Sequence, residues 1–234
     1  MPSLMRTSSS PGHSPPDSPP DNGPASSPDG PLQDKLQQLY SARAARYDLE
    51  LAPFATLRDE AIAALQLQPG RTVLDLGCGT GLSLPALRQA VGSRGRVIGV
   101  ELCPAMLVRA QQRVAEAGWR NVELQLASAE QTVLKRTADA ALFFFTHDLL
   151  QQASALPALL ARALKPGARV VAVGLCWAPP WQPWSNAFVL GAALYSVASL
   201  DGLAQPWRHL AAALRVSQLE RRCLDAAYLL QGCR

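Results

Sequence analysis

Apolar and polar positions follow two patterns along most of the chain. Short, nearly continuous apolar runs alternate with stretches in which apolar residues recur every three or four positions. The runs predict strands, and the periodic stretches predict helices. The expected strands span residues 72–76, 95–101, 121–127, 138–145 and 168–175. The expected helices between them span residues 82–90, 106–117 and 156–164. Because strands that alternate with helices form parallel sheets covered on both faces, the pattern predicts an α/β fold.

The two ends of the chain break this rhythm. Residues 1–31 are mostly Pro, Ser, Gly and Asp, with almost no large apolar side chain. Such a segment cannot bury enough surface to offset its ordering entropy, so we expect a disordered tail before one domain over residues 32–234. Two helical patterns fill residues 32–66. An insert fills residues 177–214; it has Trp177, Trp181 and Trp184 near its start and two helices expected over residues 186–200 and 205–214. The final stretch suits an antiparallel strand pair that closes one edge of the sheet.

Composition narrows the class of function. The net charge of +4 is scattered, without a long Lys/Arg run, which disfavours nucleic-acid binding. The five cysteines lack C-x-x-C spacing, and no apolar secretion signal is visible, so we expect reduced thiols in a cytoplasmic protein and no metal site. The apolar helix expected over residues 186–200 is shorter than the roughly 20 residues that a bilayer requires, so we expect no transmembrane segment.

A glycine turn follows the first expected strand, in the sequence VLDLGCGTGLS. Gly77, Gly79 and Gly81 are spaced G-x-G-x-G, which differs from the G-x-G-x-x-G of dinucleotide-binding turns and disfavours an NAD-dependent oxidoreductase. Asp75 lies within the strand, where its charge would repel a phosphate. Glu101 ends the second strand, where a carboxylate can accept hydrogen bonds from both ribose hydroxyls. S-adenosylmethionine carries a ribose, an ammonium and a carboxylate but no phosphate, and fits this set. The turn alone is also compatible with a tight strand-to-helix connection.

The motifs VLDLGCGTG and GVELCPAML resemble those of the class I, Rossmann-like S-adenosylmethionine-dependent methyltransferases, near the ubiquinone/menaquinone-methyltransferase-like branch. The resemblance runs from about Tyr40 to Gly174. It implies a seven-stranded, mostly parallel sheet with one reversed strand, which agrees with the terminal strand pair. It also implies that residues 32–66 form a helical lid over the cofactor and that residues 177–214 roof the substrate.

The same resemblance assigns cofactor-binding residues. The residues expected around the methionine moiety are Asp75, Gly77, Cys78, Gly79 and Gly81. The residues expected at the ribose, the adenine and the lid are Glu101, Leu102, Met106, Tyr40 and Tyr47. After the third strand the family commonly has an Asp followed by Ala, and this chain has Ser128 and Ala129 at that place. A serine can accept the hydrogen bond of the adenine amino group, but without charge assistance.

The methyl acceptor is less well defined, because the cofactor carries the difficult chemistry and a base is needed only for a protonated acceptor. His147 follows the fourth strand in FFFTHDLLQ and is a candidate base, or else a packed pocket residue. Asp148 with Gln151 has the spacing of a capping box, so we expect Asp148 to cap the next helical turn. The tryptophans of the insert either wall the acceptor or pack the insert onto the sheet: Trp177, Trp181 and Trp184.

We therefore expect an S-adenosylmethionine-dependent methyltransferase that modifies a small, fairly apolar molecule or a lipid at an oxygen, nitrogen or carbon atom. Neither the pathway nor the oligomeric state follows from the residues. A non-catalytic protein that binds S-adenosylmethionine and acts through partners would keep Asp75 and Glu101 and is the alternative.

Overall fold

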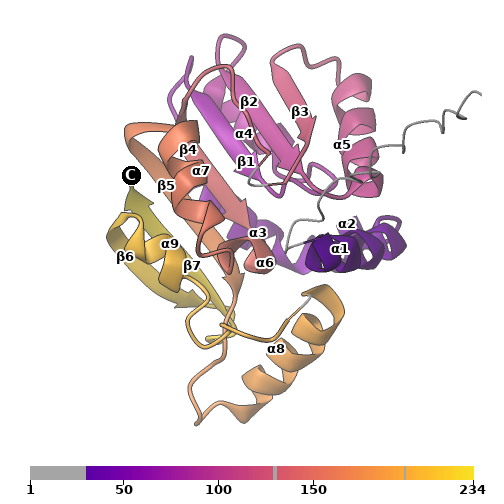
Figure 1. The fold of residues 1–234 in the computed structure, drawn as a ribbon, viewed down its shortest axis with the longest axis vertical. Helices are drawn as coiled ribbons and strands as arrows, with labels where there is room; N and C mark the ends of the chain where they lie inside the picture. Colours follow the sequence, from indigo (N-terminus) through magenta and orange to yellow (C-terminus); the bar gives the residue numbers. More distant parts are fainter. Residues whose placement is uncertain (1–29, 129–130, 198) are drawn as a thin grey trace, which may run out of the picture.

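The apolar runs form one mixed sheet of seven strands. The computed structural model describes residues 30–128, 131–197 and 199–234. Across the sheet the strands have the order β3-β2-β1-β4-β5-β7-β6 (Figure 1). Their bounds are β1 Thr72–Leu76, β2 Arg96–Glu101, β3 Val122–Leu126, β4 Ala138–Phe144, β5 Leu164–Leu175, β6 Arg215–Arg222 and β7 Ala227–Cys233. The first five strands pair in parallel, and β7 pairs antiparallel with both β5 and β6. The expected fold class, including the antiparallel terminal pair, is confirmed.

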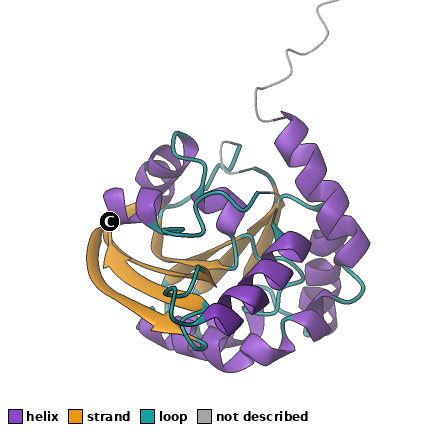
Figure 2. Ribbon diagram, turned by 90° about the horizontal axis from the view of Figure 1, so that it is seen from below, coloured by secondary structure: helices purple, strands orange, loops and turns teal. Residues whose placement is uncertain are grey.

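Helices cover both faces of the sheet, as Figure 2 shows. Their bounds are α1 Gly30–Arg43, α2 Tyr47–Glu50, α3 Ala55–Ala64, α4 Leu84–Val91, α5 Pro104–Glu116, α6 His147–Leu150, α7 Ala155–Ala163, α8 Pro183–Ser196 and α9 Arg208–Ala212, with a 3-10 turn at Ala52–Phe54. On β1, Leu74 faces the core under α7 and α9, whereas Val73 faces the core under α3, α4 and α5. Because alternate residues point to opposite faces, this one strand belongs to two apolar layers.

The order of the strands sets the position of the site. The chain crosses from β1 outward to β2 and β3, and then returns to place β4 on the other side of β1. In open parallel sheets a ligand binds beyond the carboxyl ends of the strands at such a switch point. Here that point lies after Leu76 of β1 and Phe144 of β4.

The two ends of the chain differ in part from expectation. Residues 1–29 of the expected tail lie outside the described residues, and α1 begins at Gly30, inside the range expected for the tail. The insert contains α8, which begins three residues before its expected start, and α9, which is shorter than the expected helix over residues 205–214. β5 begins at Leu164 instead of residue 168, and an irregularity in its pairing with β4 accommodates the additional residues. Among the described residues no helix combines the length and apolarity needed to cross a bilayer.

Candidate active site

A left-handed turn of three glycines lies at the carboxyl end of β1. Gly77, Gly79 and Gly81 have φ values of 71°, 57° and 84°, a region that side chains disfavour. The backbone N–H groups of Gly77 and Cys78 donate to the carbonyl oxygen of Val100 at 2.8 and 3.0 Å. These two backbone bonds fix the start of the turn against β2.

The three glycines meet different neighbours. A Cβ atom on Gly79 would lie 3.3 Å from the ring of Tyr47, on the lid side of the turn. A Cβ atom on Gly81 would lie 2.7 Å from Cδ1 of Leu84 and 3.3 Å from Cβ of Ala110, inside the helix packing. Gly79 thus keeps space between the turn and the lid, whereas Gly81 keeps space between the turn, α4 and α5.

A cavity of about 830 Å³, partly open to solvent, lies over the turn. Most of the cofactor residues expected from the sequence line it: Tyr40, Tyr47, Gly77, Gly79, Glu101, Leu102, Met106 and Ser128. Asp75, Cys78 and Gly81 do not line it: Asp75 is buried beneath the turn, the Cys78 thiol is buried against Gly99 of β2, and Gly81 faces the helices. Ala129 lies outside the described residues. The sequence analysis missed Gln37, Phe145 and Thr146, which also line this cavity.

Glu101 joins the glycine turn to the start of α5. Its Oε2 accepts a hydrogen bond from Gly79 N at 2.9 Å, and its Oε1 accepts one from Cys103 N at 2.8 Å. Burial raises the pKa of Glu101, and these backbone N–H donors oppose that shift. A carboxylate has about four lone-pair directions, so two remain for a ligand in the cavity.

Asp75 is a buried acid beneath the turn, with only 1% of its surface exposed. Its Oδ2 has no hydrogen-bond partner among the described residues. Burial raises the pKa of Asp75 to about 7; the Glu101 charge adds to that effect, and Arg58 of α3 opposes it. Arg58 was not among the site residues expected from the sequence. Its guanidinium lies 5.1 Å from the ring centroid of Phe144. A cation bound near Asp75 would relieve the cost of ionising it.

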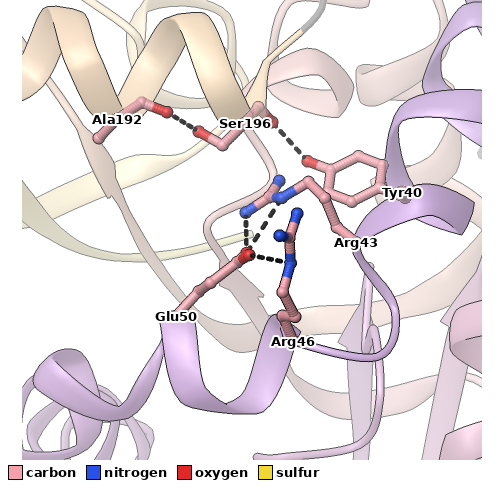
Figure 3. A network of polar contacts seen from close by, with 6 residues as sticks. All are labelled: Tyr40, Arg43, Arg46, Glu50, Ala192 and Ser196. Atoms are coloured by element: carbon pink, nitrogen blue, oxygen red, sulfur yellow. Dashed lines mark hydrogen bonds and ion pairs between the residues drawn. The ribbon is translucent and has the colours of Figure 1, made fainter.

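The helical lid carries a buried polar network (Figure 3). Arg43 donates to Glu50 Oε2 through Nε at 3.1 Å and through NH2 at 2.8 Å. Its guanidinium lies 5.5 Å from the ring centroids of both Tyr40 and Tyr47. The Tyr40 hydroxyl donates to the carbonyl oxygen of Ser196, at the end of α8, at 2.8 Å. The network thus connects the lid to the insert.

A second set of contacts fixes the lid to the glycine turn. Asp48 of α2 accepts hydrogen bonds from the Thr80 hydroxyl at 2.5 Å and from Arg113 NH2 at 2.7 Å. Arg113 also donates through Nε to the carbonyl oxygen of Thr80 at 3.2 Å. Because Thr80 lies between Gly79 and Gly81, α2, α5 and the turn are held as one unit.

A second cavity of about 870 Å³ adjoins the first. Tyr40, Tyr47 and Phe145 line both cavities and form the wall between them. The other apolar lining residues are Leu51, Pro53, Phe54, Gly174, Leu175, Phe188, Ala192 and Val197. The polar side chains that line it are Arg43, Glu50, His147 and Ser196. The second cavity is therefore an apolar space with a few polar groups, as is typical of small-molecule sites.

Phe145 of the shared wall has an unusual backbone. Its φ of 55° is in the left-handed region, which is rare for a bulky residue. Its N–H donates to the carbonyl oxygen of Val173 at 2.8 Å, and its ring packs edge-on against Phe54 with centroids 4.7 Å apart. Such strain persists only where surrounding contacts impose it, and it concentrates at functional sites.

His147 begins α6 and lines the second cavity, with 5% of its surface exposed. Its Nε2 lies 2.9 Å from the carbonyl oxygen of Asp201. Since a carbonyl can only accept, Nε2 carries the proton and Nδ1 carries the lone pair. Burial lowers the pKa of His147, which the charges of Asp148 and Asp201 and the hydrogen bond to Asp201 oppose. The neutral ring is therefore the dominant form at neutral pH.

Two expectations about this region need correction. Asp148 does not cap a helix: α6 begins one residue earlier, Thr146 is its N-cap, and no side-chain cap bond forms there. The insert tryptophans line neither cavity. Trp177 packs against the small core under α8, whereas Trp181 and Trp184 are 73% and 66% exposed. Aromatic type alone could not distinguish an inward side chain from an outward one.

Comparisons with known proteins agree with this geometry. The profile of a family described as a methyltransferase domain matches residues 73–167. Aklanonic acid methyltransferase DauC from Streptomyces sp. (strain C5) is 26% identical over 209 residues, which cover 88% of this chain and 93% of that protein. The ubiquinone/menaquinone biosynthesis C-methyltransferase UbiE from Coxiella burnetii is 30% identical over 146 residues, covering 59% of this chain and 58% of the relative.

A solved structure supports the fold. The geranyl diphosphate C-methyltransferase of Streptomyces coelicolor A3(2), in complex with Mg²⁺, geranyl diphosphate and S-adenosyl-L-homocysteine, superposes with a TM-score of 0.63 at 17% identity. The match covers 87% of this chain and 98% of that one. The sheet order, the glycine turn and the acid that ends β2 define a Rossmann-like methyltransferase. The comparisons support a class I S-adenosylmethionine-dependent methyltransferase, with S-adenosylmethionine as its methyl donor.

The first prediction separates the roles of the second and third glycines of the turn. Gly79→Ala should weaken cofactor binding by about tenfold or more, because the new Cβ pushes on the Tyr47 ring at the cavity wall. Gly81→Ala should lower the free energy of unfolding by about 1–3 kcal/mol through overlap with Leu84 and Ala110. Titration calorimetry and thermal unfolding measure the two quantities. A Gly81→Ala protein of normal stability with lost cofactor affinity would contradict this division.

The second prediction concerns the pH dependence of stability. The pKa of Asp75 is raised in the folded state, so its contribution is fully present below pH 4 and is lost as pH rises to about 7. Asp75→Asn removes this slope and should raise the free energy of unfolding at pH 8 by up to about 4 kcal/mol. Urea unfolding of the cofactor-free protein across this pH range is the measurement.

Asp139, at the opposite end of the sheet, is the matched control. Burial raises the pKa of Asp139, but hydrogen bonds from Lys165, the Thr72 N–H and Arg71 outweigh it and hold the pKa below its usual range. Its contribution is therefore lost as pH falls, and Asp139→Asn should destabilise the protein at neutral pH. Equal effects of the two substitutions at pH 8 would show that burial does not dominate at Asp75.

Proposed function

We propose that the protein transfers the methyl group of S-adenosylmethionine to a small, largely apolar molecule bound in the second cavity. The observation that carries the proposal is the shared wall of Tyr40, Tyr47 and Phe145, which brings a cavity over the glycine turn against an apolar one. Methyl transfer requires an in-line arrangement of donor and acceptor, and two adjoining cavities supply it.

The residues of the first cavity suit the donor. Glu101 has lone pairs available for the ribose hydroxyls, and the unpartnered Oδ2 of Asp75 suits the ammonium group. Gly77 and Gly79 allow close approach of the backbone to the methionine moiety. When bound, the cofactor would supply a methyl group on a sulfonium: the acceptor would form a bond to the methyl carbon as the carbon–sulfur bond breaks, with S-adenosylhomocysteine as the leaving group. The chain's own part is to orient both molecules and to exclude water.

We place the adenine beside Leu102 and Met106, which line the same cavity. Ser128 Oγ, near them, accepts a hydrogen bond from Gln131 N at 3.3 Å. A hydroxyl oxygen has a second lone pair, so Ser128 can also accept from the adenine amino group. Cys78 and Gly81 are assigned to the packing of the turn and make no contact with the cofactor in this proposal.

The acceptor class follows from the second cavity and from the relatives. Three phenylalanines line it, from the segment before α3, the end of β4 and α8: Phe54, Phe145 and Phe188. The named relatives act on aklanonic acid, in ubiquinone/menaquinone biosynthesis and on geranyl diphosphate. Residues 32–66 then act as the lid, and α8 of the 177–214 insert roofs the acceptor in place of the tryptophans.

The test of this function fills the second cavity. Ala192 of α8 lines that cavity, whereas Ala187 of the same helix is exposed. Ala192→Phe should abolish transfer of a labelled methyl group to a fractionated cell extract while leaving cofactor affinity within about twofold. Ala187→Phe, the same change on the outer face, should leave both quantities unchanged.

Mass identification of the labelled product gives the acceptor. Full transfer by the Ala192→Phe protein would place the acceptor elsewhere. Loss of transfer together with loss of cofactor binding would mean that the substitution disturbed the lid. Ala192→Gly, which enlarges the cavity, then provides an independent variant: it should raise the Michaelis constant of the acceptor without weakening cofactor binding.

His147 is proposed as the base for an acceptor that carries a proton. His147→Ala should lower turnover by about a hundredfold and leave cofactor affinity nearly unchanged. Because burial lowers the pKa of His147, the rate of the unaltered protein should rise with pH below about 6.5 and be level above it. The variant should lack this limb. His209→Ala, at the other histidine within residues 30–234, is the control. An unaltered pH profile in active His147→Ala protein would leave His147 as a packing residue.

A further inference from the structure

The outward side of α8 is apolar at every position whose side chain the structure describes. The exposed positions among them are Pro183, Trp184, Ala187, Phe188, Leu190, Gly191 and Leu194. The larger side chains are well exposed, Trp184 at 66%, Phe188 at 51% and Leu194 at 66%, and Trp181 just before the helix reaches 73%. The outer side of a helix on a globular protein is normally polar. This side is instead a contiguous apolar face, which marks an interaction surface.

Part of the inward side of the same helix is packed against the domain. Val189 and Ala193 are buried against Leu175, Leu203 and Ala226. The Asn186 side chain bonds the Ala178 backbone in both directions, accepting from its N–H at 2.8 Å and donating to its carbonyl at 3.1 Å. The helix is therefore anchored to the domain, and its apolar outer face is presented by a fixed element at the edge of the fold (Figure 1).

We propose that this face docks on the surface of a lipid bilayer. Tryptophan is enriched where a protein meets the membrane–water interface, and two tryptophans stand at the amino-terminal end of α8. Residues 177–200 contain no Asp, Glu, Lys or Arg, so the face has none of the charges that desolvation in the interface would penalise. At 14 residues the helix is about 21 Å long, and it lies along the protein surface instead of pointing out of it.

The charge of the protein complements an anionic membrane. Residues 1–29 contribute one arginine and three aspartates, so the rest of the chain carries a net charge of +6. A positively charged protein is attracted to anionic lipids, and the attraction adds to the burial of apolar area. A contact between protein chains is the competing explanation, but such interfaces surround their apolar centre with a polar rim, and the exposed positions described in α8 include no polar residue.

The docking surface continues into the second cavity. Phe188 is half exposed on the outer face and also lines that cavity, and Ala192 and Ser196 of the same helix line it as well. An apolar acceptor dissolved in the bilayer would therefore reach the cavity without crossing water. This step rests on the proposed function and names the source of the acceptor as a membrane.

The experiment measures the partition of the full chain into vesicles, without cofactor or acceptor. The probes are vesicles of phosphatidylcholine and vesicles of phosphatidylcholine mixed with phosphatidylglycerol. We expect binding to both and tighter binding to the anionic vesicles. The double variant Trp184→Ser/Leu194→Ser should lower the partition coefficient by roughly tenfold or more. Neither residue lines a cavity, so cofactor affinity should remain unchanged and shows that the variant is folded.

Val108→Ser on α5 is the matched control, because this side chain is 49% exposed and lies well away from α8 (Figure 1). It should leave vesicle binding unchanged. Absence of binding by the unaltered chain, or equal binding by the double variant, would overturn the proposal. A dimer in sedimentation equilibrium that the double variant abolishes, without vesicle binding, would assign the face to a second copy of the chain. Failure of the Ala192→Phe test leaves this measurement untouched, so the two proposals fail separately.

Discussion

The two backbone hydrogen bonds that the Glu101 carboxylate accepts hold the site together. One carboxylate oxygen accepts the N–H of Gly79 in the turn, and the other accepts the N–H of Cys103 at the start of α5. The turn is also bonded to Val100 on the same strand. Because both ends of this unit are fixed to β2, the floor of the first cavity cannot move independently of the sheet. The Asp48–Thr80–Arg113 contacts then place the lid on that floor.

Burial of two carboxylates at one site makes the cofactor-free protein less stable than it would otherwise be. Asp75 and Glu101 both have raised pKa values for the same reason, and Asp75 is raised further by its neighbour. The left-handed backbone of Phe145 adds strain at the same edge of the sheet. Unfavourable features of different origin thus gather where β1, β2 and β4 end. Unfavourable features are expected to gather at a site that binds a cationic ligand, because the bound ligand removes the electrostatic cost of burying the carboxylates.

Local patterns predicted the sheet well, and most of the residues expected at the donor line one cavity. The strands are continuous apolar runs, and the glycine spacing with Glu101 is a motif within one βαβ unit, so little tertiary information was needed. The residues that the sequence missed depend on distant contacts. Arg58 lies close to Asp75 only because α3 packs on β4 and β5, and Phe54 meets Phe145 across the same layer. The expectation that the insert tryptophans wall the acceptor was wrong for a related reason. The orientation of α8 is set by the burial of Val189 and Ala193, and no local sequence pattern distinguishes these two residues from their neighbours.

The hydrogen bond from Tyr40 to Ser196 connects the lid to α8 and so relates the two cavities to each other. The acceptor atom is a backbone carbonyl, which cannot donate, so the bond requires a protonated hydroxyl. Burial, together with the charge of Tyr47, raises the pKa of Tyr40 well above its usual value, and the hydroxyl keeps its proton throughout the neutral range. The contact is therefore a permanent part of the structure, in contrast to a switch that responds to pH. Any displacement of α8, by an acceptor in the second cavity or by a surface against its outer face, is transmitted to a side chain that also lines the cofactor cavity. On the proposed placement of donor and acceptor, each would therefore contact the same tyrosine, and we expect the binding of one to affect the binding of the other.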